Sequence, residues 1–268
     1  MRSRHPTMSF EEFERMPREL GWKYEYWDGA AHISPGHQVV VATVPTAPRS
    51  ESSPCAIRPL EPADEAPLVA AYVRAFGGTI EYCGWQPGKI VESARESVGR
   101  YLAEKRGQPH AASRVAVAVE PGEREETVVG ATLLLDGGPE LAQLDMLFSV
   151  PEWHQRGLAT AMVGSAINAL HAAGIGTLES AYVLGNAPSR AWHRKFGFSE
   201  LPDLTLARHY WRYFAEECRR LESLGESSPD EMAELARLKD YWREEAKRLE
   251  KIADEEGFEA VTPFLRRR

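Results

Sequence analysis

The chain has few cysteines, no excess of basic residues and no long apolar run, and each absence excludes a class of protein. Only three cysteines occur in 268 residues. They are far apart and form no CxxC pair, so neither a disulfide framework nor a zinc site is indicated. Thirty-two Lys and Arg stand against 40 Asp and Glu, a net charge of -8, whereas proteins that neutralise many phosphates need a basic face. We therefore expect no metal and no nucleic-acid partner.

The sequence also lacks a membrane-spanning segment and a secretory signal. One long stretch without formal charge, residues 157–178, contains polar residues and is broken by Gly174 and Gly176, so it is too interrupted to cross a bilayer. The first 13 residues lack the apolar core of a signal peptide. The remaining composition, 43% hydrophobic and 27% charged, is typical of globular proteins. We expect a cytoplasmic protein with no membrane partner.

The first 44 residues predict a small appendage that precedes the main domain. Three apolar residues at helical spacing follow Ser9, and two strand-like runs flank an Asp28-Gly29 turn, which predicts a helix and a hairpin. A further strand is expected over 39–44. Three prolines in residues 45–54 then indicate a linker.

Residues 55–204 alternate between strand-like and helix-like patterns, which predicts an α+β fold, a mixed α/β sandwich. Strands are expected at 55–60, 114–119, 127–135, 141–150, 177–184 and near Phe198, and helices at 64–76, 89–104, 158–173 and 188–195.

Residues 205–268 are densely charged and contain no strand-like run, so they predict an αα hairpin. Its first arm is expected over 208–224 with Gly225 as the C-terminal stop, and Ser228, Pro229 and Glu231 form a capping signal for the second. The hairpin either packs on its own domain as a solvated element or offers a surface for a partner or a homodimer.

The segment most informative about chemistry is the predicted strand at 141–150 with the turn and helix start that follow it, where residues 155–160 cover the end of the turn and the first residues of the helix. The turn contains Gly157, and Ala159 and Thr160 follow it in the first helical turn. The first N–H groups of a helix are unpaired and lie at the positive end of its dipole, so they can bind a phosphate group if small residues let it approach. The sequence therefore predicts an anion site here.

A second helix begins after Asn186 and ends at Phe196, Gly197 and Phe198. Together, the two helix starts and the strand between them resemble the GCN5-related N-acetyltransferases (GNAT), whose pyrophosphate loop reads Gln or Arg, two residues, Gly, one residue, Gly or Ala. The resemblance extends over residues 54–204, and Ile57 to Leu60 with Asp64 are similar to the family's first strand and helix start.

The resemblance implies the GNAT fold, with a mostly antiparallel central sheet, and acetyl-CoA as cosubstrate bound between two diverging strands. The implied cofactor contacts are the pantetheine-binding Leu147, Phe148 and Ser149, the pyrophosphate-binding Gln155, Arg156, Gly157, Leu158, Ala159 and Thr160, and Asn186. His154 departs from the family pattern, which usually has Gln or Arg at that position.

His193 stands where many family members have a tyrosine that protonates the departing CoA thiolate. A histidine with an ordinary pKa of about 6.5 is a serviceable acid for a thiolate, so we expect His193 to be the general acid. The alternative is a surface residue or one that only packs against the cofactor, with water helping the thiolate to leave.

Direct transfer also needs a neutral amine, so a base must take a proton from the attacking ammonium. Asp145 is the only carboxylate in the apolar run 141–150 and is our candidate, although it could instead have a structural partner such as an arginine or a backbone cap. Glu179, Glu81 and Tyr82 are weaker candidates. Tyr82 and Trp85 lie where family members shape the acceptor pocket, and they either contact the substrate or close the core.

Residues 8–36 resemble the opening of the Uma2 family, a restriction-endonuclease-like group. The later acidic pair and lysine that the nuclease needs are missing, so DNA cleavage is not expected.

The sequence as a whole predicts an N-acetyltransferase that moves the acetyl group of acetyl-CoA to an amine. The alternative is a GNAT domain that binds CoA but serves as a regulatory scaffold.

Overall fold

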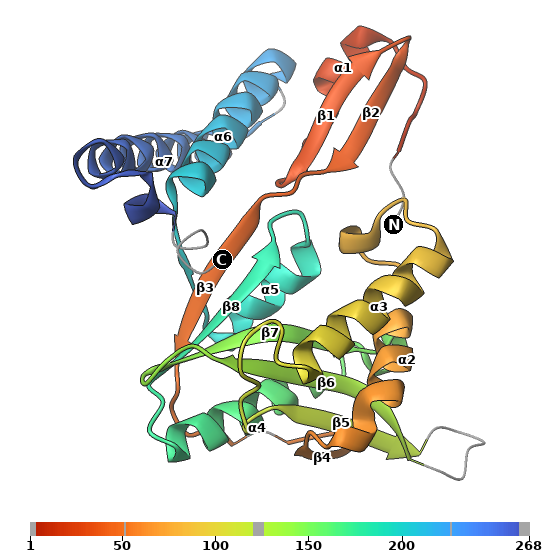
Figure 1. Cartoon of the computed structure of the whole chain (residues 1–268). Coiled ribbons are helices and arrows are strands. Elements are labelled where there is room, and N and C mark those ends of the chain that lie inside the picture. Colours follow the sequence, from red (N-terminus) through yellow and green to blue (C-terminus); the bar gives the residue numbers. More distant parts are fainter. Residues whose placement is uncertain (1–3, 51, 120–125, 226, 263–268) are drawn as a thin grey trace. The chain divides into compact units, whose positions relative to one another are not determined.

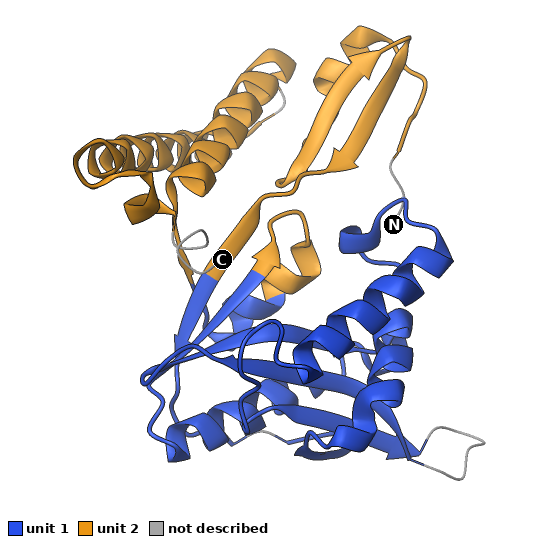
Figure 2. Cartoon of the chain, in the orientation of Figure 1, with its two compact units in different colours: residues 1, 42–181, 192–199 blue, residues 2–41, 182–191, 200–268 orange. Residues whose placement is uncertain are grey.

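The computed structural model describes residues 4–50, 52–119, 126–225 and 227–262. It divides into two compact units (Figure 2). The first contains residues 42–181 and 192–199, and the second contains residues 2–41, 182–191 and 200–268.

A seven-stranded sheet has the strand order β4-β5-β6-β7-β8-β3-β9. Its strands are β3 (Val39–Pro45), β4 (Ala56–Pro59), β5 (Arg114–Val119), β6 (Glu126–Asp136), β7 (Leu141–Ser149), β8 (Thr177–Val183) and β9 (Ser199–Leu201). The β4–β5, β5–β6 and β6–β7 pairs are antiparallel, and β7–β8 is parallel. The expected α+β class with a mostly antiparallel sheet is confirmed.

Helices cover both faces of this sheet in the first unit. Met162 of α4 (Leu158–Ala172) lies close to Gly130 of β6. Tyr72 of α2 (Glu65–Phe76) instead packs on Phe148 of β7, which is paired with Ala131 of β6 and shares its face of the sheet. Because neighbouring residues of a strand point to opposite faces, α2 and α4 lie on opposite sides of β6. β6 is accordingly buried along most of its length.

Helix α3 (Pro87–Leu102) runs beside α2 (Figure 1). Short 3-10 turns precede α2 at Pro62–Asp64 and α3 at Ile80–Tyr82. Asp64 is buried and its carboxylate receives two hydrogen bonds from the Arg58 guanidinium, at 2.6 and 2.8 Å. This pair fixes the start of α2 to the end of β4.

The predicted helix and hairpin of the N-terminal segment are confirmed. Helix α1 (Phe10–Arg15) has Ser9 in a reciprocal capping box with Glu12. Strands β1 (Trp22–Trp27) and β2 (Ala30–Pro35) are joined by Asp28 and Gly29, both at positive φ as a tight hairpin turn requires. The likeness of this segment to Uma2 stays a prediction.

The C-terminal helical hairpin is confirmed, but its first arm begins four residues earlier than expected. Helix α6 (Leu204–Leu224) starts at Leu204 because the Asp203 side chain caps the Leu206 N–H at 2.6 Å. Helix α7 (Pro229–Glu256) begins after Ser228, as predicted, and a 3-10 turn follows at Phe258–Val261.

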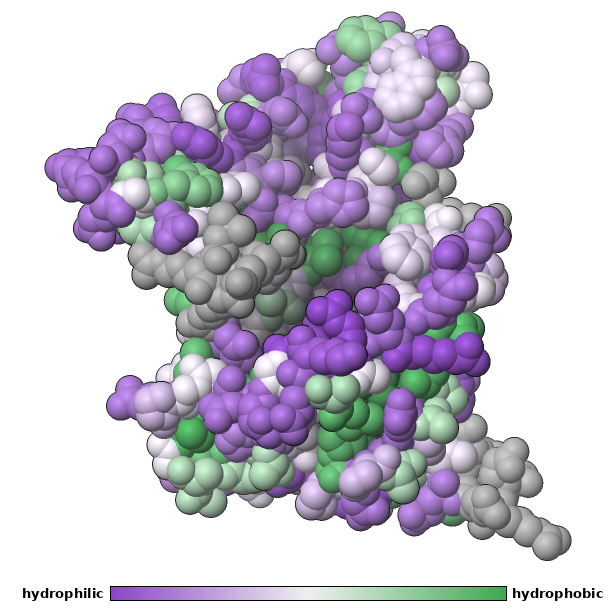
Figure 3. Space-filling model, in the orientation of Figure 1, coloured by the Kyte–Doolittle hydropathy of each residue, from purple (hydrophilic) through white to green (hydrophobic). Residues whose placement is uncertain are grey.

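Tyr210 of α6 stacks on Trp242 of α7 at 4.4 Å. Most of the surface over α6 and α7 is hydrophilic (Figure 3).

The segment expected to be a linker is bound along α4. His171 contacts the Thr46 carbonyl at 2.9 Å, and the Arg49 main chain exchanges two hydrogen bonds with the Asn168 side chain, at 2.7 and 2.8 Å. The Arg49 guanidinium also lies over the Phe196 ring and donates to the Phe196 carbonyl. These bonds give the segment a defined path.

No helix among the described residues is long and apolar enough to cross a membrane.

Candidate active site

The site is organised by the point at which β7 leaves β8. The two strands pair only from Leu141↔Thr177 to Leu144↔Ser180. On its other side β7 pairs with β6 through Leu134↔Leu144 and then Leu133↔Met146, so Asp145 is the extra residue of a β-bulge. Because a bulge bends its strand, the remainder of β7 up to Ser149 leaves the β8 ladder.

The freed edge of β7 presents main-chain groups at alternate residues. Val150 donates its N–H to Val129 of β6 at 2.9 Å. By the alternation of an antiparallel ladder, Phe148 also directs its main-chain groups to β6, whereas Leu147 and Ser149 direct theirs to the other edge. The Ser149 carbonyl contacts His154 Nε2 at 3.0 Å. Of the three predicted pantetheine contacts, Leu147 and Ser149 therefore have the suitable orientation.

The Phe148 side chain packs in the core against the rings of Tyr72 and Phe76, at 5.5 and 5.9 Å between ring centroids.

The loop after β7 has the geometry of an anion site. Pro151–Trp153 forms a 3-10 turn, Gln155 and Gly157 have positive φ values of 59° and 80°, and Gly157 is the N-cap of α4. Among the described residues no side chain caps this helix, and its first turn holds no acidic residue. A Cβ built on Gly157 meets no described heavy atom within 4 Å. The helix terminus is therefore open to an anionic group.

Side chains around this loop add charge and support. Arg156 is exposed, with its guanidinium 5.4 Å from the Trp153 ring centroid, so it can add positive charge to an anion there. Thr160 accepts a hydrogen bond at 3.1 Å from the Trp192 indole, and its own hydroxyl hydrogen stays available to donate. Leu158 is buried and anchors the first turn of α4 in the core, and Ala159 beside it is half-buried.

His193 lies in a buried aromatic setting on α5 (Ala187–Phe196). It is 4% exposed, its ring lies 4.9 Å from both Trp192 and Phe198, and its Nε2 is 2.8 Å from Ser180 Oγ. Ser180 is the last β8 residue paired with β7. The hydroxyl that contacts His193 thus belongs to the residue at which the strands separate.

Asp145 is held by one arginine through one of its two oxygens. Arg106 donates to Oδ1 from Nε at 3.1 Å and from Nη2 at 2.7 Å. Oδ2 is buried and has no hydrogen-bond partner among the described residues. Burial raises the pKa of Asp145, and the charge and hydrogen bonds of Arg106 oppose that rise. The arginine pairing considered from the sequence is therefore present, together with a free carboxylate oxygen.

Of the two residues predicted to shape the acceptor pocket, Tyr82 belongs to a chain of hydroxyl groups. Tyr82 lies 2.7 Å from both the Tyr72 hydroxyl and the Ser93 hydroxyl. Burial is the main cause that raises the pKa of Tyr72. Trp85 is 50% exposed and meets the Tyr82 ring edge-on at 5.0 Å. Tyr82 is therefore part of the core network, and Trp85 is the accessible member of the pair.

Asn186 lies in the second compact unit, where its side chain accepts the Ser189 N–H at 3.0 Å and so caps the start of α5.

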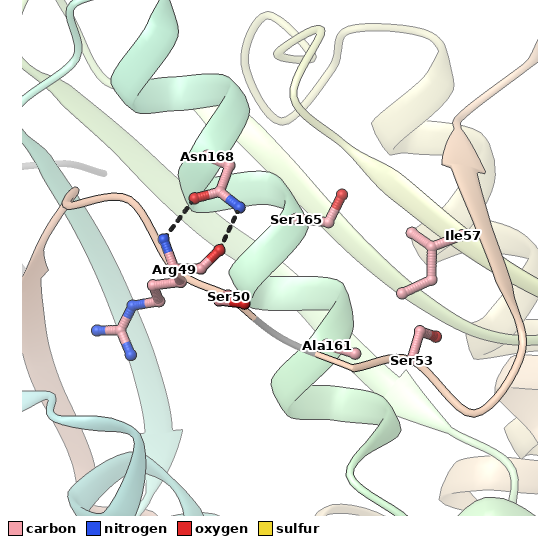
Figure 4. Close-up of a pocket in the computed structure, with 7 residues that line it drawn as sticks. All are labelled: Arg49, Ser50, Ser53, Ile57, Ala161, Ser165 and Asn168. Carbon is pink, nitrogen blue, oxygen red and sulfur yellow. Dashed lines mark hydrogen bonds between the residues drawn. The ribbon is translucent and has the colours of Figure 1, made fainter.

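A pocket of about 510 Å³ lies against α4 but contains none of the predicted site residues. Figure 4 shows Asn168 bonded to Arg49 on one side of it, with Ser165 and Ala161 along the helix. In the described part of the chain, no three side chains of the His, Cys, Asp or Glu types gather as metal ligands.

The model of the family "Acetyltransferase (GNAT) domain" matches residues 55–199. The chain belongs to the GNAT acetyltransferase family. No curated protein matches the sequence.

Three solved structures illustrate the similarity of this GNAT chain to other members. A GNAT-family protein from Novosphingobium aromaticivorans is 16% identical over 69% of this chain and 66% of its own, with a TM-score of 0.40. The match therefore spans slightly less than two thirds of that protein's length. An N-acetyltransferase from Thermoplasma acidophilum, solved with coenzyme A, is 17% identical over 54% and 89% (TM-score 0.42). An aminoglycoside 6'-N-acetyltransferase from Acinetobacter haemolyticus is 17% identical over 54% and 90% (TM-score 0.37).

Sequence reasoning missed two residues that contact the candidate site residues Asp145 and His193. Arg106 lies in the irregular segment between α3 and β5, where no periodic pattern indicates a partner for Asp145. Ser180 could have been found, because it precedes the end of a predicted strand by a few residues, but small serines inside strands are common. Both residues are recognised only through their contacts.

Proposed function

We propose that the chain is an N-acetyltransferase that transfers the acetyl group of acetyl-CoA directly to an amine. The observation that carries the proposal is the conjunction of a strand that leaves its neighbour at Leu144 with an uncapped helix terminus at Gly157. The part of β7 beyond the divergence, residues 145–149, extends over about 16 Å at about 3.3 Å per residue, which suits an extended phosphopantetheine arm. Family membership adds acetyl transfer as the reaction class.

The residues present fit the cosubstrate. The main-chain N–H groups of the first turn of α4 would bind the pyrophosphate, together with Thr160 and the charge of Arg156, since no acidic residue opposes an anion there. The edge of β7 at Leu147 and Ser149 would pair with the amide groups of pantetheine, as an added strand does. Acetyl-CoA, when bound, supplies an activated thioester.

The remaining roles concern protons. Asp145 takes a proton from the acceptor amine, and Trp85 with Tyr82 shapes the entry of the acceptor. Asn186 organises the start of α5, the helix that carries His193.

His193 is the general acid, and it acts through Ser180. Its Nε2 is already within hydrogen-bond distance of Ser180 Oγ, and the ring is almost completely buried. The proton therefore passes from His193 to Ser180 Oγ while the Ser180 hydroxyl proton passes to the leaving thiolate.

Calorimetric titration with acetyl-CoA tests the proposal. Gly157→Glu places a carboxylate in the open space at the N-terminus of α4 and should abolish binding, because it repels the pyrophosphate and itself occupies the positive end of the helix dipole. The matched control is Gly174→Glu, since Gly174 follows the C-terminal end of the same helix at positive φ and also has open space around it.

Binding by the parent and by Gly174→Glu, with loss in Gly157→Glu, supports the site and justifies a screen of amines by release of free CoA thiol. A well-folded parent that binds no acetyl-CoA contradicts the proposal.

A further inference from the structure

The ion pair at the bulge of β7 is asymmetric. Both hydrogen bonds from Arg106 end on Oδ1 of Asp145, although a guanidinium can engage both oxygens of a carboxylate in a parallel fork. The Asp145 side chain is 10% exposed and that of Arg106 is 34% exposed. The arginine therefore approaches from the solvent side and leaves the second oxygen inside.

Oδ2 of Asp145 is a buried acceptor without a donor among the described residues. Leaving a buried carboxylate oxygen unsatisfied costs free energy, so such an atom calls for an explanation, and use by a ligand or a reaction is one. The donor that suits an anionic oxygen best is itself cationic, because hydrogen bonds between opposite charges are the strongest. An ammonium group satisfies the oxygen and also balances its charge.

The position of this oxygen suits an acceptor. Asp145 is the residue at which β7 leaves β8, one residue beyond the last pair, Leu144↔Ser180. Two other titratable groups adjoin the pair: Tyr101 of α3 interacts electrostatically with Asp145, and Tyr72 of α2 interacts with Arg106. Burial raises the pKa of Tyr101 to about 12, so it stays neutral and adds no competing charge.

We propose that Arg106 is a positioning residue that clamps Oδ1 of Asp145 and so directs Oδ2 to the acceptor, which binds as an alkylammonium ion. This inference rests on the proposed function. An N–H bond of the ammonium breaks and its proton goes to Oδ2, giving a neutral carboxylic acid. The freed lone pair forms the C–N bond with the acetyl carbon, and the C–S bond breaks with its electron pair on sulfur, which then takes the proton from Ser180. A second N–H bond of the now positively charged nitrogen breaks and its proton goes to water, which leaves the neutral amide.

The experiment uses carbon-13 NMR of the Asp145 carboxyl carbon in the full chain with CoA bound, with ethylammonium and ethanol as probes of equal size. Ethylammonium should shift the resonance saturably and ethanol should not. Asp145→Asn keeps the shape but removes the charge, and it should weaken ethylammonium binding, followed through neighbouring amide resonances, about tenfold or more.

In folded Arg106→Gln, ethylammonium binding to Asp145 should weaken, a readout that a purely structural arginine would not move. Without the guanidinium, the titration midpoint of Asp145 should shift to higher pH, because the cation that opposes the effect of burial is gone. Arg106→Lys should restore part of the shift, since it keeps the charge but not the two-pronged contact. The matched control is Arg100→Gln, an exposed arginine of α3 paired with Glu96, which should leave the midpoint unchanged.

Equal responses to ethylammonium and ethanol, or an unchanged midpoint in Arg106→Gln, overturn the inference. Loss of acetyl-CoA binding in the parent would instead overturn the proposed function, and calorimetry distinguishes the two failures.

Discussion

The contact between Ser180 and His193 predicts a measurable coupling between the two side chains. The groups are 3% and 4% exposed and their polar atoms lie 2.8 Å apart. Ser180→Ala removes this buried hydrogen bond, at a cost of about 1–3 kcal/mol in the free energy of unfolding. For a chain of this size each kcal/mol lowers Tm by about 2–4 °C, so the shift is within reach of calorimetry.

The double-mutant cycle pairs Ser180→Ala with His193→Phe. Phenylalanine suits the aromatic surroundings of Trp192 and Phe198, and replacing both partners by apolar groups costs less than removing one. The two single variants should therefore destabilise the chain by more in sum than the double variant does, by about 1 kcal/mol. Additivity within about 0.5 kcal/mol would refute the coupling.

A kinetic arm separates proton delivery from packing. Loss of a general acid lowers the rate of transfer by about 10²–10⁴-fold, so both single variants should release CoA thiol slowly. The selenium analogue of acetyl-CoA has a less basic leaving group and needs less protonation, so the loss should shrink with that donor. An equal loss with both donors would refute the proton path through Ser180 and His193, and Ser165→Ala on α4 serves as the control.

Two further predictions concern the stability of the first unit. Arg58 lowers the pKa of the buried Asp64, so their pair stabilises the fold above the ordinary carboxyl pKa of about 3.9, and that contribution is lost as pH falls through the lower folded value. Arg58→Met should therefore reduce stability at pH 7 by about 1–3 kcal/mol and make urea unfolding less sensitive to acid, and an unchanged acid dependence would contradict this. Gly130→Ala should destabilise by about 1–3 kcal/mol, because its Cβ would lie 2.9 Å from the Phe148 carbonyl and 3.0 Å from Met162 Cε; a variant as stable as the parent in urea would contradict this, since both the β7 backbone and Met162 would then have to shift without cost.

Local structure could be predicted well from the sequence. Both ends of β5 and the first residue of α4 lie where the sequence predicts them. The apolar pattern of β5 and the glycine that caps α4 in the left-handed conformation are both local signals. The start of α6 was misplaced because Asp203, its cap, lies just before the charged zone from which the helix was recognised. Strand patterns and helix caps all depend on residues close together in the sequence, so predicting them needs no knowledge of distant partners.

Pairing across the sheet could not be predicted in the same way. The apolar run 39–44 indicates a strand, but nothing in it says which strand it joins. The bulge at Asp145 is similarly hidden, since side chains along β7 alternate in burial straight through it. The arginine that holds Asp145 comes from 39 residues away, a separation at which a single sequence carries no information on contact.

The place of β3 beside β8 has a practical consequence for anyone who would express this enzyme as an isolated module. The family match begins at residue 55, yet the strand order requires residues 39–45 between β8 and β9. A shortened gene that starts at the family boundary would yield a protein whose β8 lacks its neighbour, and bare strand edges favour association with other chains. A useful truncation should therefore retain the sequence from Val39 onward.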